Sequence, residues 1–401
     1  MTNKRYFFLI LILGSLTALG PFSIDMYLPG FPVIAKDLNT TTEHVAMSLS
    51  SFFIGISFGQ LLYGPLLDRF GRKKPLCFGL VLYILASIGC LYVSTLNQLI
   101  VLRGIQAIGS CAAAVASVAM VRDLFPVKDS AKVFALLMLV VGVSPMLAPT
   151  AGSYVTVLFG WHAVFIVLLG LGVLNLVFSI WFLPESFQPD TSISLKPLPI
   201  LSGFKTVLVE PQFYTYAITG ALAFSGLFAY VAGSPLVFME VFHVSTEAYG
   251  WIFALLSIGL IGASQLNSVL LRKYQSKQIV FVAICAQVVV TLIFVTGAAL
   301  QLFNLWQTIL LLFIFLSCLG LTNPNNAALS LQPFKKNAGS ASALMGATQM
   351  GLGALASSVL SLFHDKSSLP MASVMAATSI LALLVLSLNR SKIISLPSQE
   401  A

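Results

Sequence analysis

The chain has 401 residues, of which 58% are hydrophobic and only 8% are charged, and its mean hydropathy is +0.96. Because a soluble domain carries about 25% charged residues, this composition excludes a water-soluble protein and predicts one whose main solvent is lipid. The net charge of +8 does not indicate a nucleic-acid partner, since the basic residues lie in short loops between apolar runs.

The first apolar run begins at Tyr6, after Lys4 and Arg5, and continues to about Ile34. It is too long for the hydrophobic region of a signal peptide, so we interpret it as an uncleaved first span. A transmembrane helix needs about 20 mostly apolar residues. Twelve segments meet this requirement, at about 6–28, 46–66, 75–94, 97–120, 131–159, 162–183, 212–238, 248–271, 278–300, 305–330, 339–362 and 370–389.

These spans form two blocks of six, residues 1–183 and 212–401, and the second block ends in a short tail. Residues 184–211 separate the blocks, are rich in proline and serine, and carry several charges, so we predict a solvated cytoplasmic linker. Two blocks of nearly equal length indicate an internal duplication, as in transporters built from two halves. The sequence therefore predicts an all-α membrane protein with twelve transmembrane helices in two six-helix halves.

The lysine and arginine residues predict the orientation of these spans. If the N-terminus is cytoplasmic, 18 of them fall on the cytoplasmic side and only Lys36 and Lys366 fall on the opposite side. The remaining one, Arg103, lies inside a span. Since cytoplasmic loops carry an excess of basic residues, we predict that both termini are cytoplasmic and that the protein is a multi-pass protein of the inner membrane.

The cysteines and histidines show no metal-binding pattern. All five cysteines fall inside apolar segments without a CxxC spacing, so we interpret them as small apolar fillers. The four histidines fall one per outer loop, where simple exposure is the first interpretation and external pH sensing is the alternative. We expect no metal and no cofactor.

Two charged residues lie within the predicted spans, Asp25 late in the first and Arg103 early in the fourth. A charge at the bilayer centre costs at least about 2.5–3.5 kcal/mol, so it usually faces a protein interior or an aqueous cavity. Both residues lie in the outer half of the membrane, where they could meet across a cavity. We predict that Asp25 carries a proton and that Arg103 is its partner. The alternatives are a permanent ion pair that never titrates, or an arginine that only locks helices together.

The loop between the second and third spans gathers Asp68, Arg69, Arg72 and Lys73 in a short turn bracketed by glycine and proline. We expect Gly64 to permit close helix approach and Gly71 to lie in the turn. Asp68 can cap a helix end and pair with a nearby arginine, so the loop could latch the inner face shut. The alternative is that these charges only fix the topology.

The same loop, Gly64-Pro-Leu-Leu-Asp68-Arg69-Phe-Gly71-Arg72-Lys73, resembles the signature G-x-L-x-D-R-x-G-R-[KR] of the major facilitator superfamily. Arg103-Gly-Ile-Gln106-Ala-Ile-Gly109 is similar to that superfamily's R-x-x-Q-G-x-G motif, with Ala107 in place of glycine. The run of Pro145, Pro149 and Gly152 resembles the G-P-x-x-G-G motif of proton-driven antiporters, although Ala148 and Ser153 stand where that pattern has glycine.

The first span narrows the resemblance. Ser23-Ile-Asp25-Met-Tyr27-Leu-Pro29, together with Trp161-His162, resembles the bicyclomycin-resistance (Bcr/CflA) group of drug/proton antiporters. The resemblance implies a twelve-helix fold in two halves and export driven by inward proton movement. It also implies that Asp25 is the proton-coupling acid and Arg103 its partner.

The polar residues of the spans are candidates for the wall of a substrate cavity. On the N-terminal side these are Tyr27 and Gln106. In the second half, the polar run Thr322-Asn323-Pro324-Asn325-Asn326 interrupts helical hydrogen bonding at Pro324, which predicts a cavity wall or hinge, or alternatively hydrogen bonds between helices. Asn323, Asn326 and Gln349 are the cavity candidates of that half. Glu240 is a candidate second acid at the cavity mouth or, alternatively, an interfacial surface acid.

We therefore predict a proton-coupled antiporter that exports small amphipathic drugs or similar organic molecules, with the proton gradient as its energy source. The expected partners are a small-molecule substrate, protons and membrane lipid, and the expected state is a monomer. The alternatives are an exporter of a native metabolite, a proton-coupled importer, and a non-transporting receptor. The spans contain neither a Ser/His, paired-Asp or HExxH arrangement nor a Walker motif, so we expect neither an enzyme nor direct ATP coupling. The sequence leaves the substrate, the proton stoichiometry and the participation of Glu240 open.

Overall fold

The computed structural model describes residues 3–190, 204–334, 338–363, 365 and 367–394. The first half contains α1 (Asn3–Asp25), η1 (Leu28–Gly30), α2 (Phe31–Asp37), α3 (Thr42–Phe70), α4 (Lys73–Cys90), α5 (Leu96–Leu124), α6 (Val127–Phe159) and α7 (His162–Trp181). The second half contains α9 (Pro211–Pro235), η2 (Leu236–Val241), α10 (Thr246–Leu270), α11 (Ser276–Ala299), α12 (Leu305–Leu331), α13 (Ala338–Leu360) and α14 (Leu369–Ile394).

Twelve candidate membrane spans are present in the described part of the chain, which confirms the predicted all-α architecture. The first span is longer than predicted, because the chain continues through η1 and α2 to Asp37. Pro29 and Pro32 lie in the first turns of these elements, where a missing backbone N–H costs nothing. The helix α12 continues through Pro324, so the proline does not end it.

The outer surface of the bundle is apolar. Large hydrophobic side chains point away from the protein on many helices; Phe58, Phe78 and Trp306, for example, are 69%, 68% and 72% exposed. A soluble protein does not expose apolar side chains on this scale. The surface is therefore suited to lipid contact.

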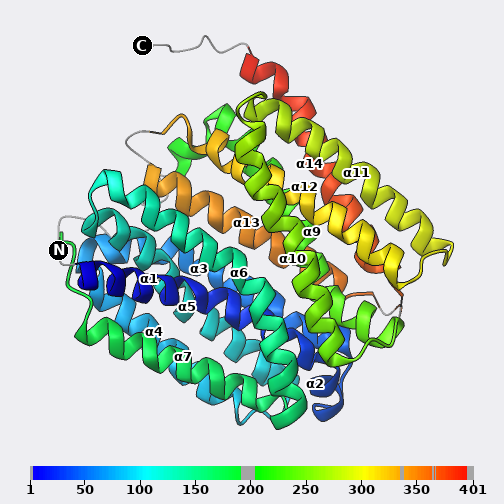
Figure 1. The fold of residues 1–401 in the computed structure, drawn as a ribbon, viewed down its shortest axis with the longest axis horizontal. Coiled ribbons are helices and arrows are strands. Elements are labelled where there is room, and N and C mark those ends of the chain that lie inside the picture. The colour runs from blue at the N-terminus through cyan, green and yellow to red at the C-terminus, as the bar shows by residue number, and fades with distance from the viewer. Residues whose placement is uncertain (1–2, 191–203, 335–337, 364, 366, 395–401) are drawn as a thin grey trace.

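The two halves lie side by side, with the N-terminal half in blue to green and the C-terminal half in green to red (Figure 1). Helix α3 packs against α13, and α6 packs against α10. The span Pro211–Val241 is the most enclosed, because 78% of its most apolar window is buried, against 33–56% for the other spans. The helix α9 therefore lies at the centre of the molecule and can carry contacts between the halves.

We call the end that carries η1 and η2 the η end, and the opposite end, which carries residues 64–74, the loop end. At the η end, Thr42 of α3 donates a hydrogen bond to Glu240 of η2. Farther along α3, the Ser50 and Ser357 hydroxyl oxygens lie 2.9 Å apart, and Ser57 donates to the carbonyl of Ala347 at 2.8 Å. These contacts hold the halves together from the η end to the middle of α3.

Candidate functional site

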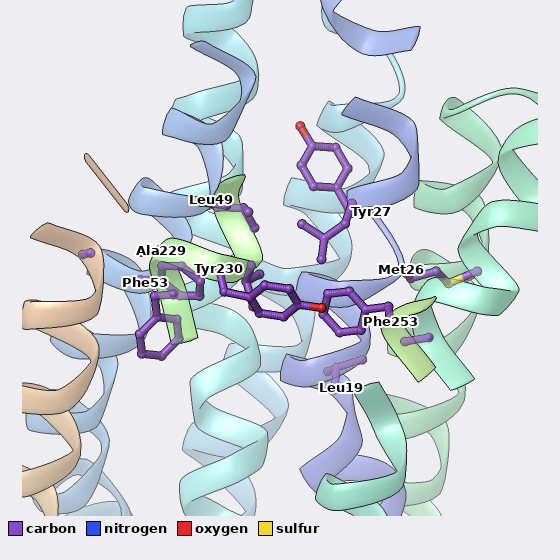
Figure 2. Packing of buried hydrophobic residues seen from close by; sticks show 14 of the residues in the cluster. Leu19, Met26, Tyr27, Leu49, Phe53, Ala229, Tyr230 and Phe253 are labelled. Atoms are coloured by element: carbon purple, nitrogen blue, oxygen red, sulfur yellow. The ribbon is translucent and has the colours of Figure 1, made fainter. Parts of the chain in front are cut away.

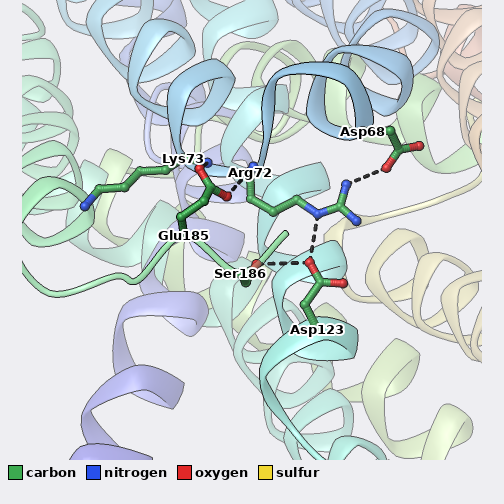
Figure 3. Close-up of polar contacts among 6 residues, drawn as sticks. All are labelled: Asp68, Arg72, Lys73, Asp123, Glu185 and Ser186. Carbon is green, nitrogen blue, oxygen red and sulfur yellow. Dashed lines mark hydrogen bonds and ion pairs between the residues drawn. The ribbon is translucent and has the colours of Figure 1, made fainter. Parts of the chain in front are cut away.

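The loop between α3 and α4 is built around a glycine with positive φ and a buried arginine, whose contacts Figure 3 shows. Gly71 ends α3 with φ of 83°, a conformation that residues with a Cβ rarely adopt. Arg72 follows, and its guanidinium donates to Asp68 Oδ1 at 2.5 Å and to Asp123 Oδ2 at 2.8 Å. Arg72 therefore joins the end of α3 to the end of α5.

Two opposing effects act on Arg72. Burial lowers the pKa of its guanidinium, but the hydrogen bonds and charges of Asp123 and Asp68 outweigh burial, and the pKa is raised from its ordinary value. Arg72 is therefore a permanent cation. Its guanidinium also lies over the ring of Phe187, 4.3 Å from the ring centre.

The beginning of the linker is bound to this loop. The Glu185 carboxylate accepts hydrogen bonds from the backbone N–H groups of Arg72 at 2.7 Å and Lys73 at 3.1 Å, which caps the N-terminus of α4. Ser186 donates to Asp123 Oδ2 at 3.0 Å, as Figure 3 shows, and the Asp190 N–H donates to the Asp68 carbonyl. The sequence analysis placed residues 184–190 in a solvated linker and missed these contacts.

The remaining residues of the predicted latch contact other groups. The Lys73 ammonium donates to the carbonyl of Ile180 at 2.6 Å, and the Arg69 side chain lies by the ring of Phe70. The expectation for Gly64 is wrong, because a Cβ there would meet nothing within 4 Å. The close approach of α3 to α5 occurs instead at Gly55, where a Cβ would overlap the carbonyl of Gly104.

Arg103 lies in the interior of the N-terminal half and is fully buried. Its guanidinium donates to Gln106 Oε1 at 2.6 Å and to the Ser23 carbonyl at 2.7 Å. The rings of Phe52 and Tyr27 lie 4.3 and 4.7 Å from it, close enough for cation–π attraction. The structure thus places the cavity candidates Tyr27 and Gln106 against Arg103.

Asp25 is the last residue of α1 and is only 6% exposed. Within the described residues, neither of the two salt bridges, Arg72–Asp68 and Arg72–Asp123, involves it. The structure therefore does not form the ion pair with Arg103 that the sequence suggested. Successive helical residues are rotated by about 100°, so Ser23 and Asp25 point in nearly opposite directions. Ser23 faces the Arg103 side, and Asp25 faces the C-terminal half.

On that side, the Asp25 carboxyl interacts electrostatically with the hydroxyl groups of Tyr230 on α9 and Tyr249 on α10. Both tyrosines are buried. Neither tyrosine was predicted from the sequence as a functional residue. A tyrosine within an apolar span is a weak indication of function, because its ring is apolar and only its hydroxyl needs a hydrogen-bond partner.

The residues of the antiporter-like motif lie on α6, which contains Pro145 and Pro149 and remains helical. Gly152 lies against the end of α1, where a Cβ would overlap the backbone oxygen of Met26. Two residues earlier, Thr150 donates to the carbonyl of Gly250 on α10 at 3.2 Å. The motif therefore joins α1, α6 and α10 at the same level as Asp25.

The polar residues of α12 form amide contacts between helices. Gln349 donates to Asn323 Oδ1 at 3.1 Å, and Asn325 donates to Asn267 at 2.6 Å. Asn326 is 3% exposed and packs beside Gly220, and its amide has no hydrogen-bond partner among the described residues. Glu240 lies at the η end, where Thr42 binds it. A role for these residues in a substrate cavity stays a prediction.

A metal site is not found in the described part of the chain, where no group of three or more His, Cys, Asp or Glu residues comes together. The candidate site consists of three parts: the Arg72 cluster, the Arg103 cluster, and Asp25 at the contact between the halves.

Residues 13–358 match the family profile described as Major Facilitator Superfamily. The chain is 31% identical to "Uncharacterized MFS-type transporter YdgK" of Bacillus subtilis, which covers 95% of this chain and 94% of the relative. It is 30% identical to "Bicyclomycin resistance protein homolog" of Haemophilus influenzae, which covers 95% and 96%. Among solved structures, a D-xylose-proton symporter superimposes with a TM-score of 0.71 at 16% identity, over 95% of this chain and 97% of that one. This chain thus belongs to the Major Facilitator Superfamily and is a multi-pass transporter of the bacterial inner membrane.

Proposed function

We propose that this transporter is a proton-coupled antiporter that exports small amphipathic drugs or similar organic molecules by alternating access. The Haemophilus influenzae relative, named for bicyclomycin resistance, supports drug export. The basic residues favour an orientation with the loop end in the cytoplasm. In that orientation, the contacts at the η end close the path to the outside.

Asp25 is the observation that carries proton coupling. It is a carboxyl group buried at the contact between the halves, and no arginine or lysine pairs with it in the described structure. A buried carboxylate without a cation is costly, so burial favours the neutral, protonated group. When the halves separate at the η end, water reaches the carboxyl group and stabilises its charged form. Proton binding at Asp25 and closure of the η end therefore favour each other.

The test is transport by full-length protein in proteoliposomes, with labelled bicyclomycin as the first probe in a panel of amphipathic drugs. We expect Asp25→Asn to abolish uphill transport driven by a pH gradient and to retain counterflow, because the amide cannot release a proton but the halves still alternate. Glu247→Gln, which removes an acid from the first turn of α10, is the control and should transport as wild type does. If Asp25→Asn transports uphill as well as wild type, Asp25 is not the coupling residue.

A further inference from the structure

On the side of the C-terminal half, Asp25 faces the hydroxyl group of Tyr230, which has no hydrogen-bond partner among the described residues. Tyr230 is 1% exposed, and its Oη makes no hydrogen bond to any described residue. A buried polar group without a partner destabilises the folded state, so an unsatisfied phenol within the most enclosed span calls for an explanation. Such groups are few in native interiors, and a functional role is one of the explanations for them.

The position of Tyr230 is fixed by its ring. The ring stacks on Phe253 of α10, with centroids 5.3 Å apart and planes 29° from parallel. Figure 2 shows Tyr230 extending from α9 toward Phe253, with Leu19 and Met26 of the first span nearby. Since Met26 directly follows Asp25, the hydroxyl is held where the first span and the C-terminal half meet.

The other titratable groups around this end of α1 already have partners. On the side of the N-terminal half, Arg103 binds Gln106 and the Ser23 carbonyl, and the hydroxyl groups of Tyr83 and Tyr27 bond Ser23 and Ser48. On the side of the C-terminal half, Tyr249 Oη lies 2.9 Å from Ser234 Oγ. Of the two tyrosines that interact electrostatically with Asp25, only Tyr230 has a hydroxyl without a hydrogen bond to the described residues.

We propose that Tyr230 is the positioning residue for Asp25, donating a hydrogen bond to its carboxylate when the proton leaves. The inference rests on the proposed role of Asp25 and adds the residue through which the C-terminal half responds to its charge. A protonated, neutral Asp25 is a weaker acceptor than a carboxylate, so the Tyr230 hydroxyl can stay without a hydrogen bond to the described residues in the present arrangement. Loss of the proton creates a charged acceptor, and the phenol donates a hydrogen bond to it.

The test is an infrared titration of purified full-length protein between pH 4 and 10, with no ligand required. The carbonyl stretch of protonated Asp25 is identified as the band that Asp25→Asn removes. A donor to the carboxylate stabilises the charged form, so Tyr230→Phe should move the midpoint of this band to higher pH by about one unit or more, a tenfold or larger gain in proton affinity. Tyr230→Phe keeps the ring and its stacking on Phe253, so the variant should fold.

Tyr249→Phe is the matched control, because it removes a hydroxyl that already bonds Ser234, and its midpoint should stay within a few tenths of a unit of wild type. A midpoint for Tyr230→Phe that is unchanged, lowered, or shifted no more than that of Tyr249→Phe overturns the inference. Failure of the proposed function has a different signature. In that case Asp25→Asn still transports uphill, whatever the infrared midpoints of the tyrosine variants.

Discussion

At the scale of single residues, the direction in which a side chain points decides its role more than its position along the chain. Asp25 and Arg103 were both predicted from their rarity within spans, and the structure buries both. Their separation was not predicted, because it depends on the rotation of α1 about its own axis. The contacts of Ser23 show this rotation. Ser23 bonds Tyr83 in the N-terminal half, so Asp25, two residues later, points toward the C-terminal half.

Gly152 gives a prediction at this scale. A Cβ there would overlap the backbone oxygen of Met26, so Gly152→Ala must displace the end of α1 that carries Asp25. Forcing atoms into a packed contact typically costs about 1–3 kcal/mol. We expect thermal unfolding in detergent to show a loss of this size, together with weaker uphill transport.

Gly170→Ala is the control for Gly152→Ala. A Cβ at Gly170 meets nothing within 4 Å, and alanine is the better helix former by up to about 1 kcal/mol. Gly170→Ala should therefore keep or raise the stability. Equal effects of the two substitutions would show that the contact with Met26 is not tight.

At the scale of elements, the sequence predicted the number of spans and the approximate place of most of them, because a run of about 20 apolar residues has few other uses. It did not predict where the helices of each span end. The first span continues past Pro29 and Pro32, since both occupy first-turn positions. The linker residues Glu185 and Ser186 looked solvated, because nothing local shows that a carboxylate will cap a helix distant in sequence.

Glu185 provides the prediction at the scale of elements. Its carboxylate accepts the first free N–H groups of α4, and loss of such a cap costs about 0.5–2 kcal/mol. Glu185→Gln removes the charge that favours the helix N-terminus, so the amides of Arg72 and Lys73 should exchange hydrogen for deuterium faster, as measured by mass spectrometry of that peptide. Glu210→Gln is the control, because Glu210 precedes α9 and makes no side-chain cap. Unchanged exchange in Glu185→Gln would argue against the cap.

At the scale of the whole molecule, the spacing of the spans predicted two blocks of six, but it did not predict the contacts that join the halves. Ser50 and Ser357 meet because α3 and α13 cross there, and serines in apolar helices give no sign of their partners. Whether the η end is open or closed therefore depends on contacts between the halves that the sequence does not show. This dependence can be tested by fixing those contacts.

A disulfide between the halves should stop alternation. The Ser50 and Ser357 hydroxyl oxygens lie 2.9 Å apart. Sulfur atoms in the same two positions would need to approach by only about 1 Å to form a bond of about 2.05 Å. In a background with the native cysteines replaced, the oxidised double variant Ser50→Cys with Ser357→Cys should lose counterflow, and a reductant should restore it. The control pair, Thr17→Cys with Ser117→Cys, joins α1 to α5 within one half, where the oxygens lie 2.8 Å apart. Oxidation should leave its transport unchanged; transport by the oxidised interhalf pair would refute opening at the η end.

The C-terminal half shields Asp25 from water, and this shielding limits how fast the carboxyl group can exchange its proton. Tyr230 and Phe253 belong to helices that move with that half, so the carboxyl group meets bulk water no more often than the halves part. Collective motions of domains take microseconds to milliseconds, far slower than proton transfer at an exposed carboxyl group. After a jump in pH, Asp25 should therefore titrate in a slow phase whose rate equals the rate at which the transporter opens. The rate of its protonation would then measure how often the transporter alternates.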